Sequence, residues 1–70
     1  MNAKNTHTRE VFFEFHPSSG RAVRVVAIDA ATGTEVVMVG DSKMSNEILK
    51  RTAARKLMYV LNKNKDETKR

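Results

Sequence analysis

Hydrophobic residues fall into three short runs and one longer periodic run along this chain of 70 residues. The short runs are rich in Val, Ile and Phe, which favour β-strands, and turn-forming residues bound each of them. They occupy residues 11–16, 21–29 and 35–40. Because the loops between the runs are short, we expect consecutive strands to pair antiparallel as a three-stranded meander.

The last run has the 3.6-residue period of an amphipathic helix and begins after Ser45. Ser45 suits the N-cap position, because its hydroxyl can accept a hydrogen bond from a free main-chain N–H. Met44 and Leu49 occupy the two positions of a hydrophobic staple. The segment from residue 47 to 61 contains neither Gly nor Pro. The predicted fold class is therefore α+β, with the order β-β-β-α.

The chain divides into three parts by composition. Residues 1–8 are polar and lack periodicity, which predicts a disordered N-terminal arm. Residues 9–63 hold all the predicted elements and form one domain, and residues 64–70 form a charged tail that we expect to fray. No window approaches the roughly 18 apolar residues of a membrane span, and the first residues lack the apolar run of a signal peptide. We therefore expect a cytoplasmic protein.

Both faces of the predicted sheet carry large apolar side chains. Phe13 and Phe15 point to one face, whereas Phe12 points to the other together with polar neighbours. One helix can cover only one of these faces, and a chain this short has a marginal core of its own. We therefore expect a symmetric homodimer. Its candidate contacts are apolar residues of the sheet and the helix: Phe12, Val26, Ile28, Ile48 and Tyr59.

Two alternatives to a dimer of folded chains stay open at this point. In a domain-swapped dimer, the helix of one copy would cover the sheet of the other, with the hinge at residues 40–43 (Gly-Asp-Ser-Lys). In a monomer, the same hydrophobic residues would simply be exposed, as single apolar side chains often are.

The net charge of +5, from 13 Lys and Arg against 8 Asp and Glu, suggests a second kind of partner. Arg51, Arg55 and Lys56 place positive charge on the predicted helix, where they could contact phosphates. Interspersed acidic residues weaken this field, and four of the 13 basic residues lie within residues 63–70. Nucleic-acid binding through the basic helix face is therefore the alternative to a protein-interaction function.

Candidate chemistry is sparse. The chain has no cysteine, which excludes disulfides, thiolate zinc sites and thiol catalysis. His7 and His16 have no second ligand at metal spacing, and no phosphate-loop pattern surrounds Gly33 or Gly40. No nucleophile and base are arranged for catalysis. We predict a non-enzymatic interaction module without metal, cofactor or small-molecule substrate, whose partner is a second copy of itself.

Four segments together resemble a known family. They are residues 10–15 (EVFFEF), 23–29 (VRVVAID), the hairpin 31–36 (ATGTEV) and the helical segment 49–61. In these segments the chain is similar to a family of short bacterial proteins of unknown function, mostly alphaproteobacterial, and the resemblance spans residues 10–62. The resemblance implies a bacterial, cytoplasmic setting. Its motifs are structural, so it transfers no functional residue.

Overall fold

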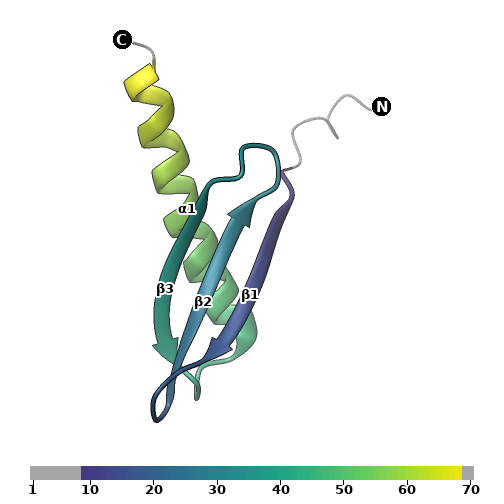
Figure 1. The fold of residues 1–70 in the computed structure, drawn as a ribbon, viewed down its shortest axis with the longest axis vertical. Helices are drawn as coiled ribbons and strands as arrows, with labels where there is room; N and C mark the ends of the chain where they lie inside the picture. Colours follow the sequence, from purple (N-terminus) through teal and green to yellow (C-terminus); the bar gives the residue numbers. More distant parts are fainter. Residues whose placement is uncertain (1–8, 69–70) are drawn as a thin grey trace.

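The computed structural model describes residues 9–68, and the side chains of residues 9–64 (Figure 1). Three strands, β1 (Val11–Pro17), β2 (Ala22–Asp29) and β3 (Glu35–Asp41), precede one helix, α1 (Asn46–Thr68). The strands form one antiparallel sheet in the order β1-β2-β3. The predicted α+β class and β-β-β-α order are confirmed. The arm predicted at residues 1–8 lies outside the described residues.

Each of the two hairpin turns contains a glycine in the left-handed region. Gly20 between β1 and β2 has a φ of 59°, and Gly33 between β2 and β3 has a φ of 78°. Residues with a Cβ rarely adopt these angles, which explains the need for glycine at both turns. The main-chain N–H of Gly33 donates to the carbonyl of Asp29 at 2.8 Å.

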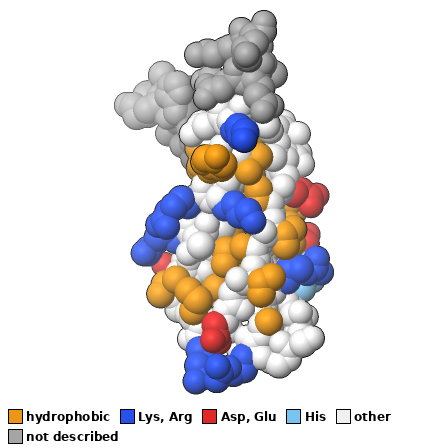
Figure 2. Space-filling view, turned by 90° about the vertical axis from the view of Figure 1, so that its left-hand side faces the viewer, with side chains coloured by type: hydrophobic (Ala, Val, Ile, Leu, Met, Phe, Trp, Pro, Cys, Tyr) orange, Lys and Arg blue, Asp and Glu red, His pale blue; other side chains and the backbone are white. Residues whose placement is uncertain are grey.

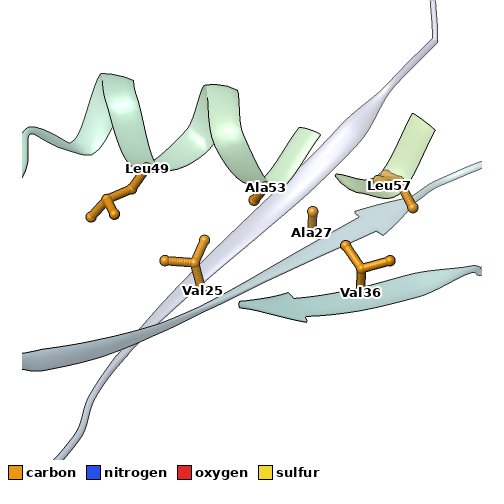
Figure 3. Packing of buried hydrophobic residues seen from close by; sticks show 6 residues of the cluster. All are labelled: Val25, Ala27, Val36, Leu49, Ala53 and Leu57. Atoms are coloured by element: carbon orange, nitrogen blue, oxygen red, sulfur yellow. The ribbon is translucent and has the colours of Figure 1, made fainter. Parts of the chain in front are cut away.

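The core lies between one face of the sheet and one stripe of α1. The strand register places Phe13 opposite Ala27, and Ala27 opposite Val36, so these side chains share a face. From α1, residues spaced four apart project onto that face, as expected for one side of a helix. The buried cluster consists of Val25, Ala27, Val36, Leu49, Ala53 and Leu57 (Figure 3).

The helix packs chiefly on β2 and β3. Phe13 and Phe15 of β1 pack at the margin of the core and stay half-buried. The ammonium group of Lys50 lies 5.8 Å from the centre of the Phe13 ring. This is the distance range of a cation–π contact. Because α1 lies over β2 and β3, it covers β1 less completely than these two strands.

The helix begins where the sequence predicted and ends later. The main-chain N–H of Ile48 donates to the Ser45 hydroxyl at 3.2 Å, which confirms the predicted cap. The helix then continues to Thr68, whereas a frayed tail was expected from residue 64. Neither Gly nor Pro occurs between residues 46 and 68, so nothing in that segment breaks the helix. Residues 69–70 of the predicted tail lie outside the described residues.

The segment proposed as a swap hinge forms a tight corner between β3 and α1. Gly40 lies within β3, and a Cβ at this position would overlap Cδ2 of the buried Leu49. In the following turn, the N–H of Met44 donates to the carbonyl of Asp41 at 2.9 Å. The N–H of Lys43 donates to the Asp41 side chain, also at 2.9 Å. Within one chain, the corner thus places α1 on its own sheet.

Candidate interaction surface

The sheet face opposite α1 carries a band of apolar side chains, and we refer to it as the open face. In Figure 1 this face points toward the reader and α1 lies behind it. Strand register arranges it in three rows: Phe12–Ile28–Glu35, Glu14–Val26–Val37 and His16–Arg24–Val39. Phe12 is 52% exposed and Val39 is 66% exposed. The apolar band therefore runs diagonally across the face, between charged residues at two opposite corners.

The predicted dimer contacts separate into two groups. Phe12, Val26 and Ile28 lie together on the open face, where Val26 is only 6% exposed because β1 and β3 flank it. Ile48 and Tyr59 are exposed on α1, away from the stripe that packs on the sheet. One flat interface cannot include both groups.

The open face also contains Val37 and Val39, which were not among the predicted contacts. Both are exposed, and both belong to the alternate set of β3 residues that points away from α1. The alternation with Val36 and Met38 was visible in the sequence. It did not reveal which of the two sets the helix would cover.

The three predicted phosphate contacts also divide. Arg51 and Arg55 are exposed and lie one turn apart on α1, and no carboxylate of residues 9–64 pairs with either. Lys56 instead turns toward the sheet, where its ammonium group donates to the Val37 carbonyl at 2.7 Å. In the view onto the β3 side of the molecule, Lys and Arg side chains are scattered and form no single patch (Figure 2).

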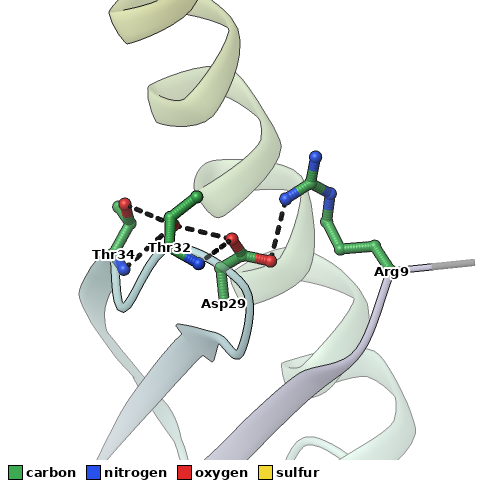
Figure 4. Close-up of polar contacts among 4 residues, drawn as sticks. All are labelled: Arg9, Asp29, Thr32 and Thr34. Atoms are coloured by element: carbon green, nitrogen blue, oxygen red, sulfur yellow. Dashed lines mark hydrogen bonds and ion pairs between the residues drawn. The ribbon is translucent and has the colours of Figure 1, made fainter.

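Asp29 is the buried charged residue within the described part of the chain. One carboxylate oxygen accepts hydrogen bonds from the hydroxyl of Thr32 at 2.6 Å and from its main-chain N–H at 3.1 Å (Figure 4). The other accepts from Arg9 Nη1 at 2.9 Å. The hydrogen bonds from Thr32, and next the one from Arg9, lower the pKa of Asp29 although burial acts to raise it. Because both oxygens are engaged, the carboxylate serves to join three segments of the fold.

The described residues form neither a metal-ligand cluster nor a membrane-spanning helix. Within residues 9–64, no group of three or more His, Cys, Asp or Glu side chains could hold a metal ion. Between residues 9 and 68, no helix is long and apolar enough to cross a membrane. A shallow, open depression lies near the β3–α1 corner and is lined by Arg21, Ala22, Val39, Gly40, Asp41 and Met44.

A comparison with protein families identifies a matching domain family. The family model for a domain of unknown function, DUF6898, matches residues 8–64. The chain belongs to the DUF6898 family. This confirms the resemblance to a family of unknown function that the sequence indicated. Neither the curated proteins nor the solved structures include a match to the chain.

The region that defines this DUF6898 domain contains every surface described above. It includes all three strands, the open face and the part of α1 that packs on the sheet. It also includes the ion pair between Arg9 and Asp29. The family match therefore covers the three strands and most of α1.

Proposed function

We propose that this DUF6898 domain is a non-enzymatic protein-interaction module that acts as a homodimer. The observation that carries the proposal is the open face, where Phe12 on β1 and Val37 and Val39 on β3 are exposed at the two ends of one apolar band that continues through Ile28 and Val26 of β2. Covering apolar surface contributes about 25 cal/mol per Å². Several such side chains therefore contribute a few kcal/mol, which is a large share of the stability of a small domain.

The open face supports this proposal better than the outer side of α1. On the open face, Phe12 lies directly opposite Ile28 in the neighbouring strand, so the apolar groups are contiguous. On α1, Ile48 and Tyr59 lie within four residues of Arg51 and Arg55, respectively, which places charge beside them. Charged residues are depleted at the centres of protein interfaces. We therefore place self-association on the sheet, at or beside β1 with its exposed Phe12, and not on the outer side of α1.

Light scattering across a dilution series tests the proposal. The wild-type chain is expected to have twice the monomer mass at micromolar concentration, and Phe12→Ser is expected to shift the midpoint of dissociation to higher concentration by about tenfold or more. Tyr59→Ser is the matched control, because it removes an even more exposed aromatic side chain from α1 (66% against 52%). A monomer mass at all concentrations contradicts the proposal, as does an equal effect of the two substitutions.

Nucleic-acid binding is the second candidate function, and two exposed arginines that pair with no carboxylate among residues 9–64 favour it. Arg51 and Arg55 could contact successive phosphates from one face of α1. A fluorescence-anisotropy titration with generic RNA and DNA at low and moderate salt tests this function. Salt-sensitive binding that Arg51→Gln and Arg55→Gln weaken would support it, and no binding at low salt would exclude it.

A further inference from the structure

The free edge of β1 exposes a regular set of main-chain groups. The N–H of Ala30 donates to the carbonyl of Glu10 at 3.0 Å. Because main-chain groups alternate in direction along an antiparallel strand, Phe12, Glu14 and His16 direct theirs toward β2. The alternate residues Val11, Phe13 and Phe15 therefore direct their N–H and C=O groups away from the sheet. Pro17 belongs to the same outward set, so its missing N–H removes no hydrogen bond to β2.

The free edge of β3 is protected in a way that the β1 edge is not. The hydrogen bond from Asp29 N–H to the Thr34 carbonyl shows that Val37 directs its main-chain groups outward. Lys56 donates to that outward carbonyl at 2.7 Å. Among residues 9–64, no side chain makes a corresponding hydrogen bond to Val11, Phe13 or Phe15. Unprotected edges are ready templates for pairing with another strand.

We propose that β1 pairs antiparallel with β1 of a second copy, about a two-fold axis that passes beside Phe13. The inference rests on the proposed function for the homodimer itself, but it places the contact along the β1 edge, beside the open face, and leaves that face uncovered. In this arrangement, Phe13 pairs with its own counterpart, and Val11 pairs with Phe15 of the other copy. The two sheets join into one continuous sheet, with both helices on the same side.

The charges on β1 favour this register over the two adjacent ones, whose axes pass beside Phe12 or Glu14. With Phe13 at the axis, Glu14 lies opposite Phe12, and Glu10 lies opposite His16. Moving the axis to Glu14 places the two copies of that carboxylate opposite each other. Moving it to Phe12 places Glu10 opposite Glu14, so two acidic residues again face each other. Like charges directly opposite each other destabilise a strand pair, whereas the Phe13 register avoids them.

The same register covers the apolar side chains that α1 leaves half-buried. Val11, Phe13 and Phe15 point to the helix side of β1, at the margin of the core. In the dimer these three residues meet their counterparts between the two helices, and the edge that exposes them disappears. On the other side of the sheet, Phe12 lies diagonally across from its counterpart, about 7–8 Å away. The two open faces therefore merge into one larger apolar surface.

Single-cysteine crosslinking of the full chain tests the register directly, because the wild-type chain contains no cysteine. Directly opposed residues in a hydrogen-bonded pair have Cα atoms about 5.5 Å apart, which suits a disulfide. Phe13→Cys is therefore expected to form a covalent dimer under mild oxidation. Val11→Cys and Phe15→Cys alone lie about 13 Å from their own counterparts and should not crosslink. A mixture of these two variants should crosslink, and it keeps Phe13 intact.

A proline substitution gives an independent test that does not alter the register. Val11 is the first residue of β1, and its N–H points outward, so Val11→Pro leaves the pairing with β2 intact while blocking the edge. This variant should remain folded by circular dichroism and become a monomer in light scattering. Glu35→Pro is the matched control, because Glu35 is the first residue of β3 and its N–H also points outward. This control should remain a dimer.

The outcomes separate the edge pairing from the dimer itself. Three results together support the edge pairing. Phe13→Cys forms a covalent dimer, the mixture of Val11→Cys and Phe15→Cys also crosslinks, and Val11→Pro is a monomer. A wild-type dimer that crosslinks mainly at Glu14→Cys, Phe12→Cys or Val39→Cys overturns the proposed register or edge. A dimer that Val11→Pro leaves intact also overturns the edge pairing, and in both cases the homodimer stands. A wild-type monomer overturns the proposed function together with this inference.

Discussion

Arg9 and Asp29 are 20 residues apart in the sequence, yet Nη1 of the arginine lies 2.9 Å from Oδ1 of the carboxylate. Arg9 precedes β1, and Asp29 ends β2 and begins the turn to β3. The carboxylate is buried, and its other oxygen accepts two hydrogen bonds from Thr32. One side chain thus joins the start of β1 to the β2–β3 turn.

Replacing Asp29 with Asn should make stability less dependent on pH. The pKa of Asp29 in the folded chain lies below its ordinary value of 3.8, so the unfolded chain binds more protons as the solution becomes acidic. The stabilisation is fully present above that ordinary value and is lost as the pH falls through the folded pKa. Urea denaturation from about pH 7 to about pH 2 measures the effect. At neutral pH, the free energy of unfolding should be larger for wild type than for Asp29→Asn, and this difference should shrink in acid.

Glu35→Gln is the control for this experiment, because Glu35 is exposed on the open face. Its denaturation midpoints should follow those of wild type across the pH range. Parallel curves for wild type and Asp29→Asn would show that the carboxylate does not supply the pH dependence.

Gly40→Ala should destabilise the fold by about 1–3 kcal/mol, because the added methyl group overlaps Leu49 in the core. The free energy of unfolding in urea measures the effect. Val39→Ala changes the neighbouring, exposed residue and should cost less than about 0.5 kcal/mol in the monomer. Gly40→Ala at wild-type stability would mean that Leu49 can move away without loss of packing.

Ser45→Ala should lower the stability by about 1 kcal/mol, because the Ile48 N–H loses the hydroxyl that accepts its hydrogen bond. Thermal denaturation followed by circular dichroism at 222 nm suits this measurement, since it reports on α1. Ser42→Ala, three residues earlier in the same exposed turn, is the matched control and should have the melting temperature of wild type. Equal melting temperatures for all three proteins would argue against the cap.

Lys56→Met should change the stability of the monomer by less than about 1 kcal/mol but promote association through β3. Removing the ammonium group frees the Val37 carbonyl on the β3 edge and leaves an apolar side chain beside it. Species larger than a dimer should therefore appear in light scattering at high concentration. Lys63→Met makes the same change of charge elsewhere on α1 and should not produce them. Equal association in both variants would assign the effect to net charge alone.

The sequence predicted the elements of this fold well, because the signals are local. Val-rich runs bounded by Gly, and a Ser cap before a periodic segment, depend only on neighbouring residues. The end of α1 lies beyond the position that the charged composition after residue 63 predicts. The absence of helix-breaking residues up to Thr68 was the better guide.

The surfaces were harder to predict, because they depend on where α1 lies on the sheet. The sequence indicated that both sheet faces are apolar, and the structure adds that Phe12, Val37 and Val39 share the uncovered one. Contacts between distant segments, such as Lys56 with Val37, leave no local signal in one sequence.

The position of α1 over β2 and β3 has a consequence for how the molecule opens. β2 is hydrogen-bonded on both sides and also lies beneath the helix, so α1, β2 and β3 can hold together while β1 detaches. Such local opening would let amide protons of β1 exchange with solvent long before those of Val25 and Ala27. In the isolated chain, β1 is thus the outermost unit in a hierarchy of local opening. A second copy bound along it would slow its exchange first.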